Sequence, residues 1–362
     1  MGIFRVSLCL FRVIHSLPVT IVLYSVFLII KGKLPVKSFV SESERAGLAS
    51  DEGLEDKELR RFKMIAYLIL VHRYPNQFKR LFKAIYHPSN HYLIHVDKRS
   101  GAGLHAEIQD FLSTYPNASL LKSEKAIWGG YSLVDAELRG IKELLKMGLK
   151  WEFFINLSAQ DFPLKSQTYI HNFLGKHRGE NFLKVSNQAT VRPDTMPRIE
   201  YYVTESGDEI LDTPLLKRPF LRGVTPYIGN QWMILSRKFC EFVSDSPEVD
   251  RFKKFYQNTF IADEGFFQTV IMNTSYKGTI VNDDKRTIDW VPMGTIKLRP
   301  RDFTAKDAGF LMASNDLFAR KFDETVDSGI LNILESHISQ PSALPVERSR
   351  RMDRAVPVGV RV

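Results

Sequence analysis

The sequence predicts an α/β fold, with a single domain built on a parallel sheet and a membrane anchor in front of it. Three observations support this prediction. From residue 62 onward, apolar runs of strand length alternate with segments of helical periodicity. The 362 residues are 44% hydrophobic and 12% aromatic, which suits a sizeable core and excludes a disordered chain. Near the amino end, a run of eighteen residues contains no Lys, Arg, Asp or Glu.

This uncharged run, Val13 to Ile30, is just long enough to cross a bilayer and lacks the small-residue cleavage site of a secretory signal. We therefore expect a transmembrane signal anchor at 13–30 behind a short basic tail at 1–12. An uncleaved hydrophobic hairpin or a buried core helix is the alternative. Residues 31–61 have the charged, small-residue composition of a stalk, and residues 336–362 are expected to be a basic, disordered tail.

The net charge of +9 does not indicate a nucleic-acid partner, because most of it lies at the two ends. Residues 1–37 carry five basic residues and no acid, and residues 346–362 carry five arginines against two acids. The body between them keeps a charge of about +1, which is not the footprint of a duplex binder. Two cysteines, Cys9 and Cys240, are too few for a disulfide framework or a cysteine-based zinc site.

The folded domain is expected to span residues 62–335 and to open with a strand, a helix and a strand. An apolar run of strand length ends at Val71, and the segment PNQFKRLFKAIY from Pro75 has apolar residues at helical spacing. The strand HYLIHV then ends before Asp97. This order predicts a parallel strand pair joined by a right-handed crossover.

Parallel sheets bind ligands at the carboxyl ends of their strands, so Val71, His72, Arg73 and Asp97 are expected to share one crevice. A carboxylate there can accept hydrogen bonds from a ribose or a base edge. No Gly-x-Gly-x-x-Gly follows the first strand, which makes a mononucleotide sugar a better fit than a dinucleotide. The alternative is that Asp97 only caps the turn after it.

The middle of the chain continues the alternation. SLLKS predicts a short strand, and WGGYS leads into an amphipathic helix that ends at Gly148. WEFFINLS predicts another apolar strand, and Asp161 follows it in a polar turn fixed by Pro163. Asp161 is therefore either a second carboxylate at the strand ends or an ordinary turn residue.

The second half is less regular. Residues 192–220 are rich in Pro, Thr, Asp and Arg and predict a long excursion on the substrate side. GNQWMILSRKFCEFV predicts a buried strand and a helix capped by Ser236. Asp263 and Glu264 precede FFQTVIM and so stand at a helix start, where the helix dipole favours acids. The final basic and aromatic stretch contains Trp290, Arg299, Arg301, Arg320 and Lys321.

These segments resemble glycosyltransferase family 14 in content and in order. The matching motifs are AYLILVHRYPNQFKRLFKAIYHPSNHYLIHVDKRS, IWGGYSLVDAEL, FINLSAQDFPLKS, GNQWMILSRKFCEFV, DEGFFQTVIMN and LFARKFD. The family comprises core 2 and I branching β-1,6-N-acetylglucosaminyltransferases, peptide O-xylosyltransferases, and related plant and bacterial enzymes. The resemblance spans about residues 62–323 and implies a GT-A-like, Rossmann-type nucleotide-sugar fold.

The resemblance implies an inverting transfer from a UDP-sugar to a glycan or protein hydroxyl, with N-acetylglucosamine as the first choice of sugar and xylose as the second. Family members work without a divalent metal, and this sequence has no Asp-x-Asp, so no metal or other cofactor is expected. Glu264 stands where the family places the general base. The leaving diphosphate then needs fixed cations, and the family's pair falls on Lys321 and Arg299, with Arg301 close by.

The remaining donor residues also follow from the resemblance. Val71, His72 and Asp97 correspond to the nucleoside site, which agrees with the strand-end argument. Tyr131 and Asp161 lie in motifs near the donor.

On the acceptor side, Trp290 resembles an aromatic residue that stacks on the acceptor sugar, and a buried core tryptophan is the alternative. Arg198 and Tyr201 are expected to face the acceptor, although the excursion around them aligns poorly. For Lys321, a solvated basic pair with Arg320 is the alternative to a role in phosphate binding.

The paired cysteines of the animal enzymes are missing, which points to plant, microbial or bacterial members. The anchor and stalk suit a type II Golgi enzyme in a eukaryote, and the inner membrane or the cytoplasmic face in a bacterium. A catalytically silent glycan-binding or scaffolding protein is the other functional class to consider, although it has no need for Glu264 and Lys321 together. A glycoside hydrolase needs two opposed carboxylates, whereas Asp263 and Glu264 are adjacent.

Overall fold

The computed structural model describes residues 64–217, 219–293 and 297–340. The expected basic tail, anchor and stalk lie outside the described residues, as does most of the expected carboxyl-terminal tail. Within the part that is described, no helix is long and apolar enough to cross a bilayer. The last helix among the described residues runs from Gly329 to Ser339 and so continues past residue 335, where the domain was expected to end.

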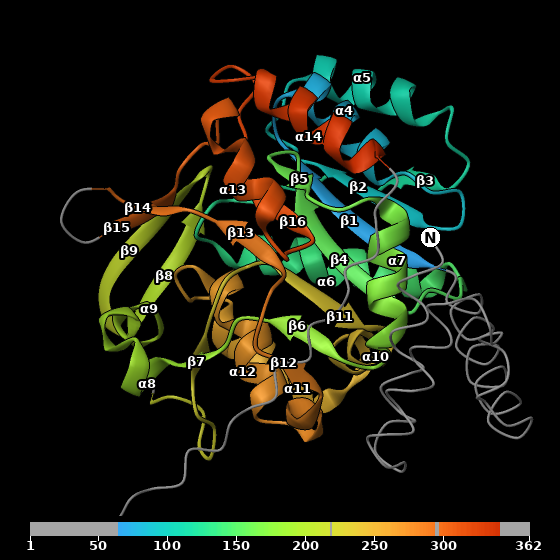
Figure 1. Cartoon of the computed structure of the whole chain (residues 1–362). Helices are drawn as coiled ribbons and strands as arrows, with labels where there is room; N and C mark the ends of the chain where they lie inside the picture. Colours follow the sequence, from blue (N-terminus) through green and yellow to red (C-terminus); the bar gives the residue numbers. More distant parts are fainter. Residues whose placement is uncertain (1–63, 218, 294–296, 341–362) are drawn as a thin grey trace, which may run out of the picture. The chain divides into compact units, whose positions relative to one another are not determined.

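A seven-stranded sheet forms the centre of the domain (Figure 1). Its strands are β1 (Ile65–Val71), β2 (His91–Val96), β3 (Ala118–Leu120), β4 (Phe153–Ser158), β6 (Asn181–Leu183), β11 (Met233–Ser236) and β12 (Ile280–Val281). The strand order is β12-β6-β11-β4-β1-β2-β3. β1 pairs in parallel with β2 and with β4, which confirms the predicted parallel pair. β11 runs antiparallel to both of its neighbours, so the sheet is mixed rather than purely parallel.

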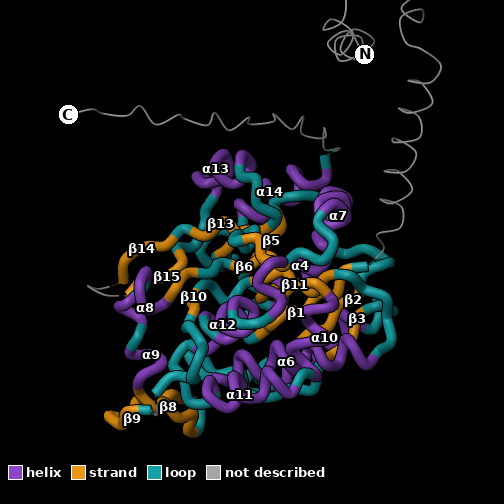
Figure 2. The backbone as a smooth tube through the Cα atoms, turned by 90° about the horizontal axis from the view of Figure 1, so that it is seen from below, coloured by secondary structure: helices purple, strands orange, loops and turns teal. Residues whose placement is uncertain are grey.

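Helices cover both faces of the sheet (Figure 2). The helices on one face are α4 (Pro75–Ile85), α5 (Ala102–Leu112), α7 (Gln167–Lys176), α13 (Ala308–Ala313) and α14 (Gly329–Ser339). Those on the other are α6 (Tyr131–Lys146), α10 (Arg237–Asp245), α11 (Pro247–Tyr256) and α12 (Phe266–Met272). The predicted cap of α10 is confirmed, because Ser236 Oγ accepts a hydrogen bond from the Phe239 amide.

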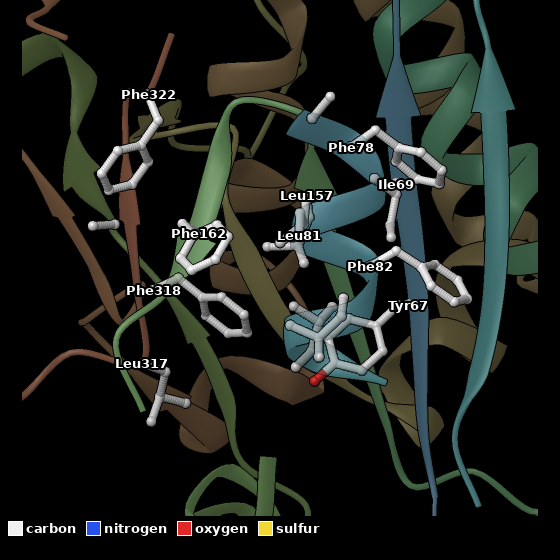
Figure 3. Packing of buried hydrophobic residues seen from close by; sticks show 14 of the residues in the cluster. Tyr67, Ile69, Phe78, Leu81, Phe82, Leu157, Phe162, Leu317, Phe318 and Phe322 are labelled. Carbon is white, nitrogen blue, oxygen red and sulfur yellow. The ribbon is translucent and has the colours of Figure 1, made fainter. Parts of the chain in front are cut away.

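β1 is apolar throughout because both of its faces are covered. Tyr67 and Ile69 belong to the core on the α4 side, whereas Ala66 and Leu68 belong to the core on the α6 side. Figure 3 shows the α4 side, where aromatic and aliphatic side chains of the helix lie against the strand. Each such fully buried side chain contributes about 2 kcal/mol through the apolar area that it removes from water.

The smaller strands lie outside the main sheet. β5 (Asp161–Pro163), β13 (Arg286–Ile288) and β16 (Phe318–Arg320) form a three-stranded sheet, and β14 (Trp290–Met293) pairs with β15 (Lys297–Pro300). β7 (Ser186–Asn187) pairs with β10 (Tyr227–Ile228). The expected excursion at 192–220 contains the one-turn α9 (Pro197–Glu200) and a hairpin of β8 (Tyr201–Ser206) and β9 (Glu209–Leu216). Gly207 supplies the positive φ of 62° that the hairpin turn requires.

Candidate active site

The carboxyl ends of β1, β2 and β4 meet at one edge of the sheet, as the sequence predicts. The Asp97 amide donates to Val71 O at 2.9 Å, and the Ala159 amide donates to Leu70 O at 3.0 Å. His72 follows directly on β1, and its side chain is only partly open to solvent. The predicted strand-end residues Val71, His72 and Asp97 therefore share one place in the fold.

Asp97 is only 4% exposed, and both of its carboxylate oxygens are engaged. Oδ1 accepts from the Arg99 amide at 2.8 Å, and Oδ2 accepts from Arg99 Nη2 at 2.9 Å and from the Ala126 amide at 3.1 Å. Burial alone would raise the pKa of Asp97, but these hydrogen bonds outweigh it and lower the pKa. Asp97 thus caps the turn after β2, and a nucleoside here would have to share a carboxylate already held by Arg99.

His72 is a neutral imidazole near neutral pH. Desolvation and the charge of Arg73 lower its pKa, with smaller contributions from Arg99 and Lys321. The contribution of Lys321 places that ammonium within electrostatic range of His72, although the two residues are far apart in the sequence. A neutral ring at this edge can donate or accept one hydrogen bond without adding charge.

Asp161 is neither an exposed turn residue nor a free carboxylate. It is 0% exposed, Oδ2 accepts from the Ser158 amide at 2.5 Å, and Oδ1 lies 3.4 Å from Arg320 Nη1. β5 and β16 run antiparallel, with Asp161 directly opposite Arg320. The Arg320 guanidinium also lies 4.0 Å from the centre of the Trp232 ring. Asp161 is therefore the counter-ion of a buried arginine, and Arg320 is not a solvated residue.

Lys321 leaves β16 beside the ends of β1 and β4. Its neighbour Phe322 donates its amide to Gln160 O at 2.9 Å and accepts from Gln77 Nε2 at 3.0 Å. The Lys321 ammonium is partly buried, and it lies 3.4 Å from Asp302 Oδ1. Tertiary structure thus brings this carboxyl-terminal cation to the edge where His72 and Asp97 lie.

The two candidate arginines near residue 300 differ in their partners. Arg301 Nε donates to Asp289 Oδ2 at 2.8 Å, and Arg301 Nη2 donates to Asp307 Oδ1 at 2.9 Å. These bonds raise the pKa of Arg301, and the Arg301 guanidinium holds the pKa of Asp307 at about 2. Arg299 is exposed in β15 and forms no ion pair with any residue that the structure describes. Of the two, Arg299 is the arginine open to a ligand.

The aromatic candidate Trp290 begins β14 and is 38% exposed, so it is not a core tryptophan. An exposed indole can stack on a sugar ring. Tyr201, the other acceptor-side aromatic, is likewise exposed at the start of β8.

Glu264 lies in a 3₁₀ turn, η3 (Ala262–Glu264), immediately before α12 rather than in the first turn of that helix. Its Oε2 accepts a hydrogen bond from Arg198 Nη1 at 2.7 Å, and both side chains are about one quarter exposed. Ile261, three residues before Glu264, has a φ of 51°, and its amide donates a hydrogen bond to Gly129 O at 2.7 Å. The Glu264 turn is thereby attached to the WGGYS loop, which comprises residues 128–132.

The two glycines of that loop are required by close packing. A Cβ at Gly130 would collide with the Glu205 carboxylate, and a Cβ at Gly129 would meet the Phe260 ring at 2.7 Å. Glu205 Oε1 accepts from the Ser132 amide at 2.7 Å and so ties the β8–β9 hairpin to the start of α6. The predicted donor residue Tyr131 is in contact with Phe266 at a ring distance of 6.4 Å, which places it beside the Glu264 turn.

Sequence reasoning missed two buried carboxyl groups beside Glu264. Asp263 was interpreted only as a helix-start acid, yet it is almost fully buried, and Glu137 on α6 is 0% exposed. The signal for Glu137 was present, because Val134, Glu137, Ile141 and Leu144 occupy one apolar helical face. A charged residue in such a stripe indicates either a buried partner or a functional site.

In the described part of the chain, no group of three or more His, Cys, Asp or Glu side chains is arranged to hold a metal ion. The expectation that no metal is needed stays a prediction.

Similar known proteins test the family resemblance that the sequence motifs indicate. The family model of the Core-2/I-Branching enzyme matches residues 65–310, which includes Glu264 and Arg299 but ends before Lys321. Similar proteins include Xylosyltransferase 2 of Pan troglodytes, 33% identical over 78% of this chain and 34% of that protein, and Xylosyltransferase 2 of Mus musculus, 32% identical over 87% and 39%. Xylosyltransferase 1 of Rattus norvegicus is 33% identical over 79% of this chain and 37% of that protein.

The chain thus spans between a third and two fifths of the length of these relatives. The family resemblance inferred from the six motifs is confirmed. Because the family model covers more than half of the chain, this protein is a member of the Core-2/I-Branching enzyme family, a family of glycosyltransferases.

Proposed function

We propose that the protein is an inverting glycosyltransferase that moves a sugar from a UDP-sugar to a protein or glycan hydroxyl, with Glu264 as the general base. The main support for this proposal is the position of the Glu264 carboxylate in a chain of this family. The carboxylate is partly exposed, it is oriented by Arg198, and its turn is attached to the WGGYS loop. A base must be both anchored and reachable by the acceptor hydroxyl. The arrangement of Glu264 suits both needs.

The proposed donor site is the edge formed by the ends of β1 and β2. The neutral imidazole of His72 and the backbone around Val71 are available to a nucleoside there, and Lys321 adds a cation within electrostatic range. Inversion requires the hydroxyl to attack the anomeric carbon from the face opposite the diphosphate. We therefore place the diphosphate toward Lys321 and the acceptor toward Glu264.

The leaving diphosphate needs positive charge in the absence of a metal. Lys321 supplies one cation. Arg299 is preferred as the second, because Arg301 is committed to Asp289 and Asp307. The proposed metal independence rests on the missing Asp-x-Asp sequence.

The names of the similar proteins are relevant to which sugar the donor contains. Since these relatives are named xylosyltransferases, we place UDP-xylose before UDP-N-acetylglucosamine, which reverses the order expected from the sequence. A protein hydroxyl then becomes the first acceptor to test, with a glycan hydroxyl as the second.

The test is calorimetric titration of the full chain with UDP-xylose, UDP-N-acetylglucosamine, UDP-glucuronic acid and UDP, all in chelator, followed by measurement of UDP release with peptide and glycan acceptors. Preferential binding of one UDP-sugar together with acceptor-dependent UDP release is the expected result. Glycan binding with no UDP-sugar binding would instead identify the silent glycan-binding or scaffolding protein.

A further inference from the structure

Two buried carboxyl groups lie on the core side of the Glu264 turn. Asp263 is 6% exposed, and Glu137, which α6 directs into the same core region, is 0% exposed. α6 and the Glu264 turn are in direct contact, and Asp263 is close enough to raise the pKa of Glu137 electrostatically. Buried carboxyls normally have a complete set of partners, because an unpaired buried charge is strongly destabilising.

Each of these two carboxyls has an oxygen without a partner, although the other oxygen of Glu137 is satisfied. Glu137 Oε1 accepts from Asn156 Nδ2 at 2.7 Å and lies 3.4 Å from Gln231 Nε2. In contrast, Glu137 Oε2 and Asp263 Oδ1 have no hydrogen-bond partner among the described residues. Two carboxylate oxygens cannot satisfy each other, but a protonated carboxyl and a carboxylate can.

The surrounding charges decide where the proton resides. Glu264 faces Asp263 from the same turn, Arg198 faces it from α9, and Arg192 acts on Glu264. The side chains that reach Glu137 from β4 and from the segment before β11 are the neutral amides of Asn156 and Gln231.

Desolvation and the Glu264 charge raise the pKa of Asp263 to about 7, whereas burial and then Asp263 itself raise that of Glu137 well above the usual value. The charge of an ionised Asp263 thus holds the proton on Glu137.

We propose that Glu137 and Asp263 share one proton, Glu137 Oε2–H donating to Asp263 Oδ1, and that this pair positions Glu264 and sets the charge behind it. This inference rests on the proposed function of Glu264 as the base. The shared proton satisfies both unpaired oxygens and leaves a single negative charge at Asp263. A negative charge beside Glu264 favours the transition state, in which Glu264 takes up the acceptor proton.

The first experiment compares pH profiles of kcat/KM for UDP-sugar transfer by the full chain. In the wild type, kcat/KM is expected to rise about three- to tenfold as Asp263 ionises near pH 7. Asp263→Asn removes that rise, whereas Glu137→Gln retains it, because the glutamine amide still donates to Asp263. Glu143→Gln, a partly exposed position on the same helix, is the matched control. An Asp263→Asn profile that is lower but parallel to the wild type would overturn the proposal, since a merely structural role acts equally at every pH.

The second experiment needs no activity. Infrared difference spectra of the wild type at about pH 8 should contain the C=O stretching band of a protonated carboxyl, where free carboxyls are ionised. The band is expected to vanish in Glu137→Gln and to persist in Glu143→Gln. A band without any sugar transfer would overturn the proposed function and support the proton-sharing pair, whereas transfer without the band would overturn the pair alone.

Discussion

Arg198 Nη1 donates a 2.7 Å hydrogen bond to Glu264 Oε2, although 66 positions separate the two residues. The guanidinium comes from the one-turn helix α9 and the carboxylate from the turn before α12. Arg198 was expected to contact the acceptor; in this arrangement it contacts the candidate base. Because Glu264 Oε1 forms no hydrogen bond with the described residues, that oxygen is the one we assign to the acceptor hydroxyl. A carboxylate paired in this way keeps a fixed orientation, which a general base needs.

Glu264→Gln should keep the hydrogen bond from Arg198 and therefore the local fold. It should also keep UDP-sugar affinity but lose turnover by about 10²- to 10⁴-fold, because the amide cannot take the acceptor proton. Initial rates and calorimetry on the same preparation measure both quantities. Glu248→Gln, at an exposed glutamate of α11, is the control. Full activity of the Glu264 variant would remove this residue from the role of base.

Lys321→Ala and Arg299→Ala should each weaken UDP binding about tenfold or more, because each removes one cation from a metal-free diphosphate site. Arg301→Ala should leave UDP affinity nearly unchanged, since its guanidinium is bound to Asp289 and Asp307. Titration calorimetry with UDP in the presence of chelator measures the UDP affinity of all three variants. An unchanged affinity of the Lys321 variant, or a large loss in the Arg301 variant, would contradict this assignment of the cations.

Removal of divalent metals should not change the rate of transfer. The expectation follows from the absence of Asp-x-Asp in the sequence and from the two candidate cations, Lys321 and Arg299. Rates measured in chelator and then in added Mn²⁺ or Mg²⁺ test it. A strict requirement for manganese would refute the metal-free site.

Asp161→Ala should destabilise the domain by about 3–5 kcal/mol, because it leaves the Arg320 guanidinium buried without its counter-ion. Asp161→Asn should cost less, since its amide oxygen can still accept from the Ser158 amide. Urea unfolding measures the difference, with Asp245→Ala at an exposed position as the control. A loss under 1 kcal/mol in Asp161→Ala would show that Arg320 does not depend on this carboxylate.

The stability should fall in mild acid because of His171. Its Nε2 lies 2.8 Å from Asn90 Oδ1, and burial, with a smaller contribution from His87, lowers its pKa to about 4. An unfolded histidine has a pKa of about 6.5, so between these values the unfolded chain binds a proton that the folded chain does not. The free energy of unfolding should therefore decrease as the pH falls from about 6.5 to about 4, by up to about 3 kcal/mol.

Urea unfolding of the wild type and of His171→Gln at a series of pH values tests this. The variant should lose less stability over the same window, because glutamine does not titrate. Identical pH dependence in both proteins would assign the acid sensitivity to other groups.

The local sequence was sufficient to predict most of the helices and strands around the site. The alternation of apolar runs and helical periodicity predicted β1, α4, β2, α6 and β4, and Ser236 marked the start of α10. Local patterns suffice there because periodicity and capping depend on residues within one or two turns. The family was also accessible from sequence, since its motifs are contiguous and ordered.

Features that depend on contacts between distant parts of the chain could not be predicted in this way. Nothing local indicated that β11 would run antiparallel, because its direction depends on which strand edges are free when the sheet assembles. The hairpin β8–β9 was interpreted as an irregular excursion, although Glu205 anchors it to the start of α6.

Patterns along the chain were enough to predict most strands and helices of the domain, its family, and the types of residue available for chemistry. Which of these residues act together depends on the folded arrangement: Asp161 with Arg320, Arg198 with Glu264, and Lys321 with the end of β1. Burial and electrostatic pairing act through space, and the pairs Asp161–Arg320 and Arg198–Glu264 join residues 159 and 66 positions apart. A pattern read along the chain contains no information about that distance.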